Sequence, residues 1–221
     1  MRTNRIRAFS VAAGLVAWNG LVDPRLPARW QPVLRAALGT ALVAVTRPPL
    51  GLRPPALRSG VRLGSTVATA AAAGVAATTT IPSVRASMRQ RELPARPARW
   101  VLLRIPVGTV WSEEAAFRAG LRQLSADAFG PNAGRVLQAT AFGLSHIADA
   151  RSTGEPVVAT VLMTAMAGWA FDWLAERSGS LAAPILAHLA INEVGALAAR
   201  VAQRNWAAGH TVRISTNTLR R

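Results

Sequence analysis

The sequence has no cysteine, no lysine and no tyrosine among its 221 residues. Without cysteine, the protein has no disulfide framework, no thiolate metal ligand and no thiol nucleophile. Aromatic residues make up only 5% of the chain, so few rings are present on which nucleic-acid bases could stack. These absences exclude a cysteine hydrolase and a disulfide-stabilised domain, and they argue against a single-stranded nucleic-acid binder.

Negative charge is also scarce, with 10 acidic residues against 26 arginines and a formal net charge of +16. The arginines concentrate beside apolar stretches, in residues 2–7, 47–62, 85–99 and 200–221. Basic loops next to apolar segments are typical of membrane proteins, whose arginines meet anionic lipid headgroups. We therefore expect anionic lipids, and not nucleic acid, as partners of the basic segments.

Long apolar stretches fill much of the remaining chain, which is 51% hydrophobic and only 16% charged. At a rise of ~1.5 Å per residue, about 20 helical residues cross a ~30 Å hydrocarbon core. Seven segments approach this length: residues 8–22, 31–46, 61–81, 100–124, 136–147, 156–174 and 181–201. The segment 136–147 is short, so its helix either extends back to Gly134 or is shielded from lipid by protein. The pattern predicts an all-α, multi-pass bundle of about seven helices in the cell membrane.

A polar, proline-punctuated stretch at residues 85–99 divides the chain. We predict transmembrane helices in residues 1–84, a basic linker at 85–99, a functional core at 100–203 and a basic tail at 204–221. The first apolar run resembles a secretory signal, but no convincing cleavage site follows it, so we expect a retained helix. Three crossings would place the N-terminal arginines and the basic linker on opposite sides of the membrane, whereas basic segments tend to stay on the cytoplasmic side. Either one early segment does not cross, or the linker lies along the opposite surface.

A pair of carboxylates opens the candidate site in the segment 100–124. Glu114 and Arg118 are four residues apart and share a helix face, which predicts an ion pair between them. Glu113 points about 100° away from Glu114, given 3.6 residues per turn, and no basic residue follows it at the third or fourth position. Glu113 is therefore the carboxylate free to accept a proton from water, as a general base does.

Two more polar pairs with the same spacing occur in later apolar segments. His146 follows Phe142 by four residues, and Asn192 follows His188 by four. An imidazole and an amide can donate hydrogen bonds to a developing oxyanion in a water-poor site. They can equally connect neighbouring helices through hydrogen bonds, and the spacing alone does not decide between the two roles.

Asp172 is a further acidic residue in an apolar segment. It could cap a helix end, orient a histidine or face water. Its place towards the end of the segment 156–174 favours the role at a helix end.

A zinc site is an alternative use of the same residues, because two histidines and one or two carboxylates can bind zinc and leave a position for water. The sequence contains no H-E-x-x-H motif, and the ligands would have to come from three separate segments. We therefore predict that no metal or other cofactor is bound, and we keep the zinc peptidase as the alternative.

In chain order, these residues resemble three motifs of one family. Residues 113–118 (EEAAFR) are similar to EExxxR, residues 142–146 (FGLSH) to FxxxH, and residues 188–192 (HLAIN) to HxxxN. These are motifs of the CAAX-protease and bacteriocin-processing (CPBP, or Abi) family of intramembrane proteases. The resemblance covers residues 100–203, about half of the chain, and the helices before it vary within the family.

The resemblance implies a helical endopeptidase in which Glu113 and His146 activate a water molecule. It further implies that His188 and Asn192 stabilise the oxyanion, with Glu114, Arg118 and Phe142 supporting the site. The implied substrate is a membrane-anchored peptide or protein. A fold does not fix function, however. The alternative is a non-catalytic membrane scaffold or a bacteriocin self-immunity protein that uses the same polar cavity.

Overall fold

The computed structural model describes residues 2–90, 93–94 and 96–218, with side chains described up to residue 204, and this part of the chain contains helices and no strand. The N-terminal half consists of α1 (Arg2–Ala17), η1 (Trp18–Val22), η2 (Asp23–Arg25), α2 (Gln31–Thr46), α3 (Ala56–Thr78) and α4 (Pro82–Gln90). After the short α5 (Pro97–Arg99) come η3 (Trp100–Trp111), η4 (Glu114–Leu121), α6 (Arg122–Phe129), α7 (Pro131–Ser145), α8 (Ile147–Thr153), α9 (Val157–Ser178) and α10 (Ala182–Thr218). The predicted all-α class is confirmed.

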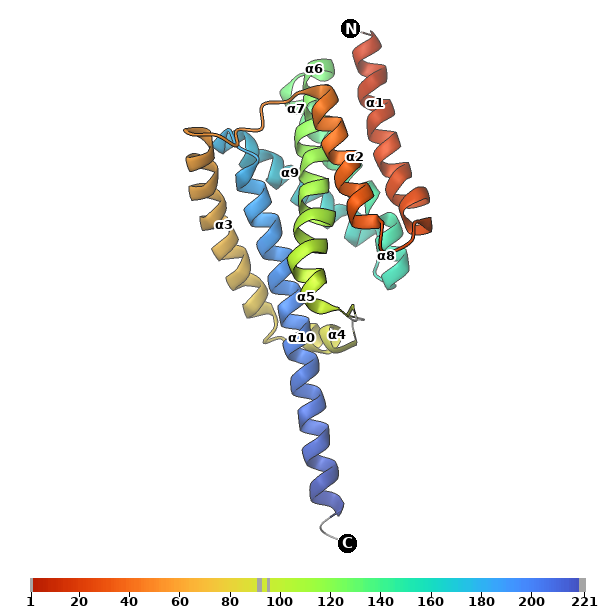
Figure 1. Ribbon diagram of the computed structural model, residues 1–221, viewed down its shortest axis with the longest axis vertical. Helices are drawn as coiled ribbons and strands as arrows, with labels where there is room; N and C mark the ends of the chain where they lie inside the picture. Colours follow the sequence, from red (N-terminus) through yellow and green to blue (C-terminus); the bar gives the residue numbers. More distant parts are fainter. Residues whose placement is uncertain (1, 91–92, 95, 219–221) are drawn as a thin grey trace.

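The long helices lie side by side along the axis of one bundle (Figure 1). They are α1, α2, α3, α7, α9, α10 and the continuous run from η3 through η4 to α6. The short helix α4 is bent by 95° from α3 and lies at the end of the bundle opposite the N-terminus. Within the predicted linker 85–99, residues 85–90 belong to α4 and residues 97–99 form α5, so the described part of the linker is largely helical.

Several helices are longer than the apolar pattern predicts. The first begins at Arg2, and α7 begins at Pro131, directly after Gly130 at φ 83°. Proline suits the first helical position because its missing N–H would have no partner there. The short predicted segment 136–147 is therefore part of a 15-residue helix. Apolar periodicity ends at the first polar turn, whereas the backbone hydrogen bonds continue through it.

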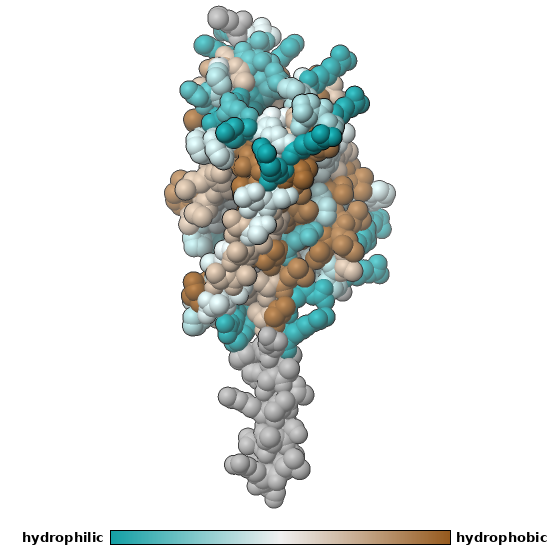
Figure 2. All heavy atoms as spheres, turned by 90° about the vertical axis from the view of Figure 1, so that its left-hand side faces the viewer, coloured by the Kyte–Doolittle hydropathy of each residue, from teal (hydrophilic) through white to brown (hydrophobic). Residues whose placement is uncertain are grey.

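On the face shown in Figure 2, apolar side chains gather below a hydrophilic end of the bundle. On α9, the exposed fractions of Val158, Leu162 and Met166 are 73%, 59% and 66%, and their spacing of four places them on one outward face. Val157–Ser178 and Ala182–Arg204 are long and apolar enough to cross a bilayer, and the bent pair of α3 and α4 would be a third span. These faces indicate a membrane protein.

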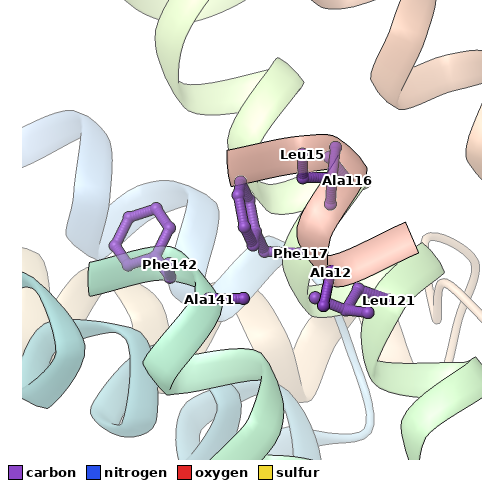
Figure 3. Packing of buried hydrophobic residues seen from close by; sticks show 7 residues of the cluster. All are labelled: Ala12, Leu15, Ala116, Phe117, Leu121, Ala141 and Phe142. Atoms are coloured by element: carbon purple, nitrogen blue, oxygen red, sulfur yellow. The ribbon is translucent and has the colours of Figure 1, made fainter. Parts of the chain in front are cut away.

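The largest buried cluster joins the N-terminal half to the predicted functional core (Figure 3). Its members come from α1, η4 and α7: Ala12, Leu15, Ala116, Phe117, Leu121, Ala141 and Phe142. Helices in lipid associate through close packing of this kind. The first helix therefore supports the segment that carries the carboxylate pair.

Helix α2 packs on the same segment through Gly39. A Cβ atom at Gly39 would lie 2.6 Å from the carbonyl oxygen of Ser112. Only glycine allows this approach, and small residues at helix interfaces in lipid have this effect. The contact fixes the backbone immediately before Glu113.

Candidate active site

The carboxylate pair lies where two π-helical segments meet. Glu113 immediately precedes η4, and η3 ends two residues before it with Pro106 in its interior. Wider π-helical turns occur frequently at functional sites. The two neighbouring side chains differ in exposure. Glu114 is fully buried, whereas the side chain of Glu113 is 19% exposed.

The buried carboxylate of Glu114 connects η4 to α10. Its Oε1 atom lies 2.8 Å from Nδ1 of His188, and its Oε2 atom lies 3.4 Å from Nε of Arg118. Because a carboxylate oxygen only accepts, Nδ1–H of His188 donates this bond. The ion pair between Glu114 and Arg118 that the spacing predicts is present, and His188 extends it to a second helix.

Aromatic rings surround this ion pair. The guanidinium carbon of Arg118 lies 3.7 Å from the ring centroid of Phe142 and 5.2 Å from that of Phe171. Phe171 also stacks on His188 with a centroid distance of 5.0 Å. Cation–π contacts of this kind favour a desolvated guanidinium. Phe142, a predicted supporting residue, and Phe171, which the sequence pattern did not single out, thus hold the charged groups in position.

Glu113 is the more exposed of the two carboxylates that lie close to His188. Its Oε2 atom lies 3.8 Å from Nε2 of His188, beyond hydrogen-bonding distance. A cavity of about 20 Å³ borders Glu113, which is room for one water molecule. Among the described residues, Glu113 has no ion-pair partner on its own helix, as the spacing indicates, and its contact with His188 comes from α10.

The N-terminal half supplies polar walls to this small cavity. Arg35 of α2 and Asn19 of η1 line it together with Glu113. Arg35 forms a hydrogen-bonded ion pair with Asp23, with Nε lying 2.7 Å from Oδ1. The sequence analysis did not single out these residues. The available signal was an arginine inside the apolar segment 31–46, where charge is costly and usually functional.

His146 lies at the C-terminal end of α7. Its Nδ1 atom is 2.8 Å from the carbonyl oxygen of Phe142, and its ring meets the Phe142 ring edge-on at a centroid distance of 4.7 Å. Because a carbonyl only accepts, Nδ1 carries the proton and Nε2 the lone pair of the neutral ring. Within the described part of the chain, no hydrogen bond or ion pair joins His146 to Glu113, and Phe142 connects His146 to the rest of the cluster.

Asn192 lies one helical turn after His188 on α10. Its side-chain amide donates to the carbonyl oxygen of His188 at 3.1 Å. This bond stays within one helix, whereas the bond from His188 to Glu114 joins two helices. Of the two predicted donors, His188 is therefore the one that contacts the carboxylates.

Asp172 does not lie at a helix end, and that prediction is wrong. It lies inside α9, where its carboxylate receives Nε of Arg122 at 2.9 Å and Nε of Arg135 at 2.6 Å. Its side chain is only 3% exposed. Arginines from α6 and α7 thus neutralise an acidic residue of α9, a pairing that spacing along a single helix cannot reveal.

The donor set does not suit a metal ion. Among the residues that the structure describes, no group of three or more His, Asp or Glu side chains gathers closely enough to bind one. Catalytic zinc is typically held by three protein ligands, and the described residues do not bring three such side chains together.

A comparison with known protein families finds a match to the part of the chain that contains this site. Residues 95–194 match the family described as type II CAAX prenyl endopeptidase Rce1-like. This span contains all three polar motifs, from Glu113 to Asn192. The chain matches no curated protein and no solved structure. Residues 95–194, a little under half of the chain, are therefore similar to the Rce1-like family of CAAX-type proteases.

Proposed function

We propose that the protein is an intramembrane endopeptidase that hydrolyses a membrane-anchored peptide or protein with a water molecule activated by Glu113 and His146. The observation that carries this proposal is the meeting of Glu113, Glu114 and Arg118 with His188, in which Glu113 also borders a cavity of one water volume. Peptide hydrolysis within a bilayer requires such a polar site, closed to lipid and open to water.

Glu113 is suited to the role of general base. Its Oε2 atom has no hydrogen-bond partner among the described residues, so it is free to accept a proton from water. His146 presents the lone pair of Nε2, since Nδ1–H donates to the backbone. In the proposed reaction, one acceptor takes a proton as the water oxygen bonds to the scissile carbonyl carbon, and this proton passes to the amide nitrogen as the C–N bond breaks. The second proton of the water leaves the new carboxylic acid and is released to solvent, so that a carboxylate and an amine are the products.

His188 is suited to the stabilisation of negative charge. Its Nδ1–H bond to Glu114 fixes the orientation of the ring and directs Nε2 towards Glu113. In the doubly protonated ring, Nε2–H donates a hydrogen bond to the oxyanion of the tetrahedral intermediate. We assign Asn192 to the same step as a second donor, after its amide leaves the carbonyl oxygen of His188.

The proposal extends to the organisation of the chain. Residues 100–203 form the catalytic core, residues 1–84 add membrane helices, and the basic linker 85–99 and tail 204–221 contact anionic lipids. The reaction requires no metal or other cofactor. We place the protein in the cell membrane, and the matched family suggests prenylated C-terminal segments as the first substrates to test.

Cleavage of a lipid-anchored peptide in proteoliposomes tests the proposal. Glu113→Gln, His146→Ala and His188→Ala should each abolish cleavage while the protein still inserts. Removal of a single group that acts in the transition state costs about 100-fold or more. Glu155→Gln is the matched control, because Glu155 lies exposed between α8 and α9. Unchanged cleavage by Glu113→Gln would refute the glutamate mechanism, and a cellular phenotype retained without cleavage would favour the scaffold or immunity protein.

A further inference from the structure

A second and larger cavity lies on the other side of the buried ion pair. Its volume is about 430 Å³, and its wall includes Arg118 and the neighbouring Ala119. It occupies the end of the bundle where α6 and the turn between α9 and α10 lie (Figure 1). It shares no lining residue with the small cavity at Glu113.

The lining of the large cavity combines charged and amide side chains with prolines, leucines and alanines. Arg122, Gln123, Asp172 and Glu176 are among its polar members. Lipid chains do not solvate such groups, whereas water does. These side chains therefore favour water in this part of the cavity.

Two loops border the outer side of this cavity, which remains partly open. The segment after α2 and the turn before α10 line it and are joined by two hydrogen bonds. The N–H group of Leu181 donates to the carbonyl of Leu50 at 2.9 Å, and the hydroxyl of Ser180 donates to the carbonyl of Gly51 at 2.8 Å. Irregular backbone is tolerated at a membrane boundary where it borders water or protein. The cavity thus lies where one end of the bundle meets the aqueous phase.

Its inner wall contains polar atoms that need water. The side chain of Arg118 is fully buried, and its Nη1 and Nη2 atoms have no hydrogen-bond partner in the described part of the chain. The fully buried hydroxyl of Ser125, which precedes the lining residue Ala126 on α6, also has no partner in the described part of the chain. Buried polar groups of this kind are normally satisfied by internal water.

We propose that the large cavity is a hydrated entrance through which water reaches the site from one side of the membrane, past Arg118 and Glu114, without using the path of the substrate. The proposal rests on the proposed function, because hydrolysis consumes one water molecule per bond. The ion pair and its two phenylalanines then separate a wet compartment from the cleavage site.

Thiol labelling tests this entrance directly, because the chain has no cysteine of its own. Ala126→Cys and Ala175→Cys introduce single thiols into the cavity wall, and Leu162→Cys introduces one on the outward face of α9. The reagent is a charged, membrane-impermeant methanethiosulfonate, which needs water and a thiolate to react. In proteoliposomes, both cavity thiols should be labelled and the thiol at position 162 should not. Absence of labelling at both cavity positions would overturn the proposal.

A second readout tests the route itself. Labelling of Ala175→Cys fills part of the cavity, so it should abolish most of the cleavage that the unlabelled variant shows, without changing capture of substrate in a Glu113→Gln background. Labelled protein that cleaves at the unlabelled rate would overturn the water route. If the protein cleaves nothing at all, the labelling pattern still decides whether the cavity is hydrated, so failure of the proposed function and failure of the entrance remain distinguishable.

Discussion

Replacement of Asp172 by alanine should destabilise the protein strongly, although Asp172 has no role in the proposed chemistry. The substitution leaves the guanidinium groups of Arg122 and Arg135 without their shared carboxylate, with side chains only 14% and 12% exposed. Breaking a buried ion pair by removing one partner costs about 3–5 kcal/mol. For a chain of this length, each kcal/mol lowers Tm by about 2–4 °C. Multiplying this cost by the fall in Tm per kcal/mol gives an expected fall in Tm of roughly 6–20 °C.

Thermal unfolding in detergent, followed by circular dichroism, measures this effect. Glu176→Gln is the matched control, because Glu176 pairs with the same Arg135 but its side chain is 55% exposed. An exposed ion pair contributes about 0–1 kcal/mol, so this control should shift Tm little. A triple variant with leucine at positions 122, 135 and 172 should recover stability, since apolar residues replace a complete buried network at little cost. A Tm for Asp172→Ala equal to that of the control would refute the reasoning.

Three further outcomes follow from the site. Glu114→Gln should lower both activity and Tm, because it leaves the fully buried Arg118 without a counter-charge, at a cost of about 3–5 kcal/mol; retained stability with lost activity would contradict this. Gly168→Val should reduce kcat, since a Cβ atom there would lie 2.9 Å from the ring of Phe142, whereas Gly74→Val, in open space, should not. Chelation should leave cleavage unchanged, and stoichiometric zinc in purified protein with activity restored by zinc would support the peptidase alternative.

Much of the fold followed from local sequence. Apolar segments predicted the helices, because a backbone in lipid must satisfy its own hydrogen bonds and a helix does so within one segment. The spacing of four between Glu114 and Arg118 predicted their contact, because residues four apart share one helix face. Interactions inside one helix are therefore readable from the chain by itself.

Contacts between helices were decided only by the tertiary structure. Nothing in the spacing of residues shows that His188 meets Glu114, or that Asp172 lies between arginines of α6 and α7. Nor does it show that η1 and α2 line the cavity at Glu113, from a half of the chain that carries no motif. Pairing across helices depends on packing angles and close approaches such as that of Gly39, which many separate residues set together. The sequence by itself determined which groups are costly to bury, and the packed bundle determined which of them neutralise one another and where water has room.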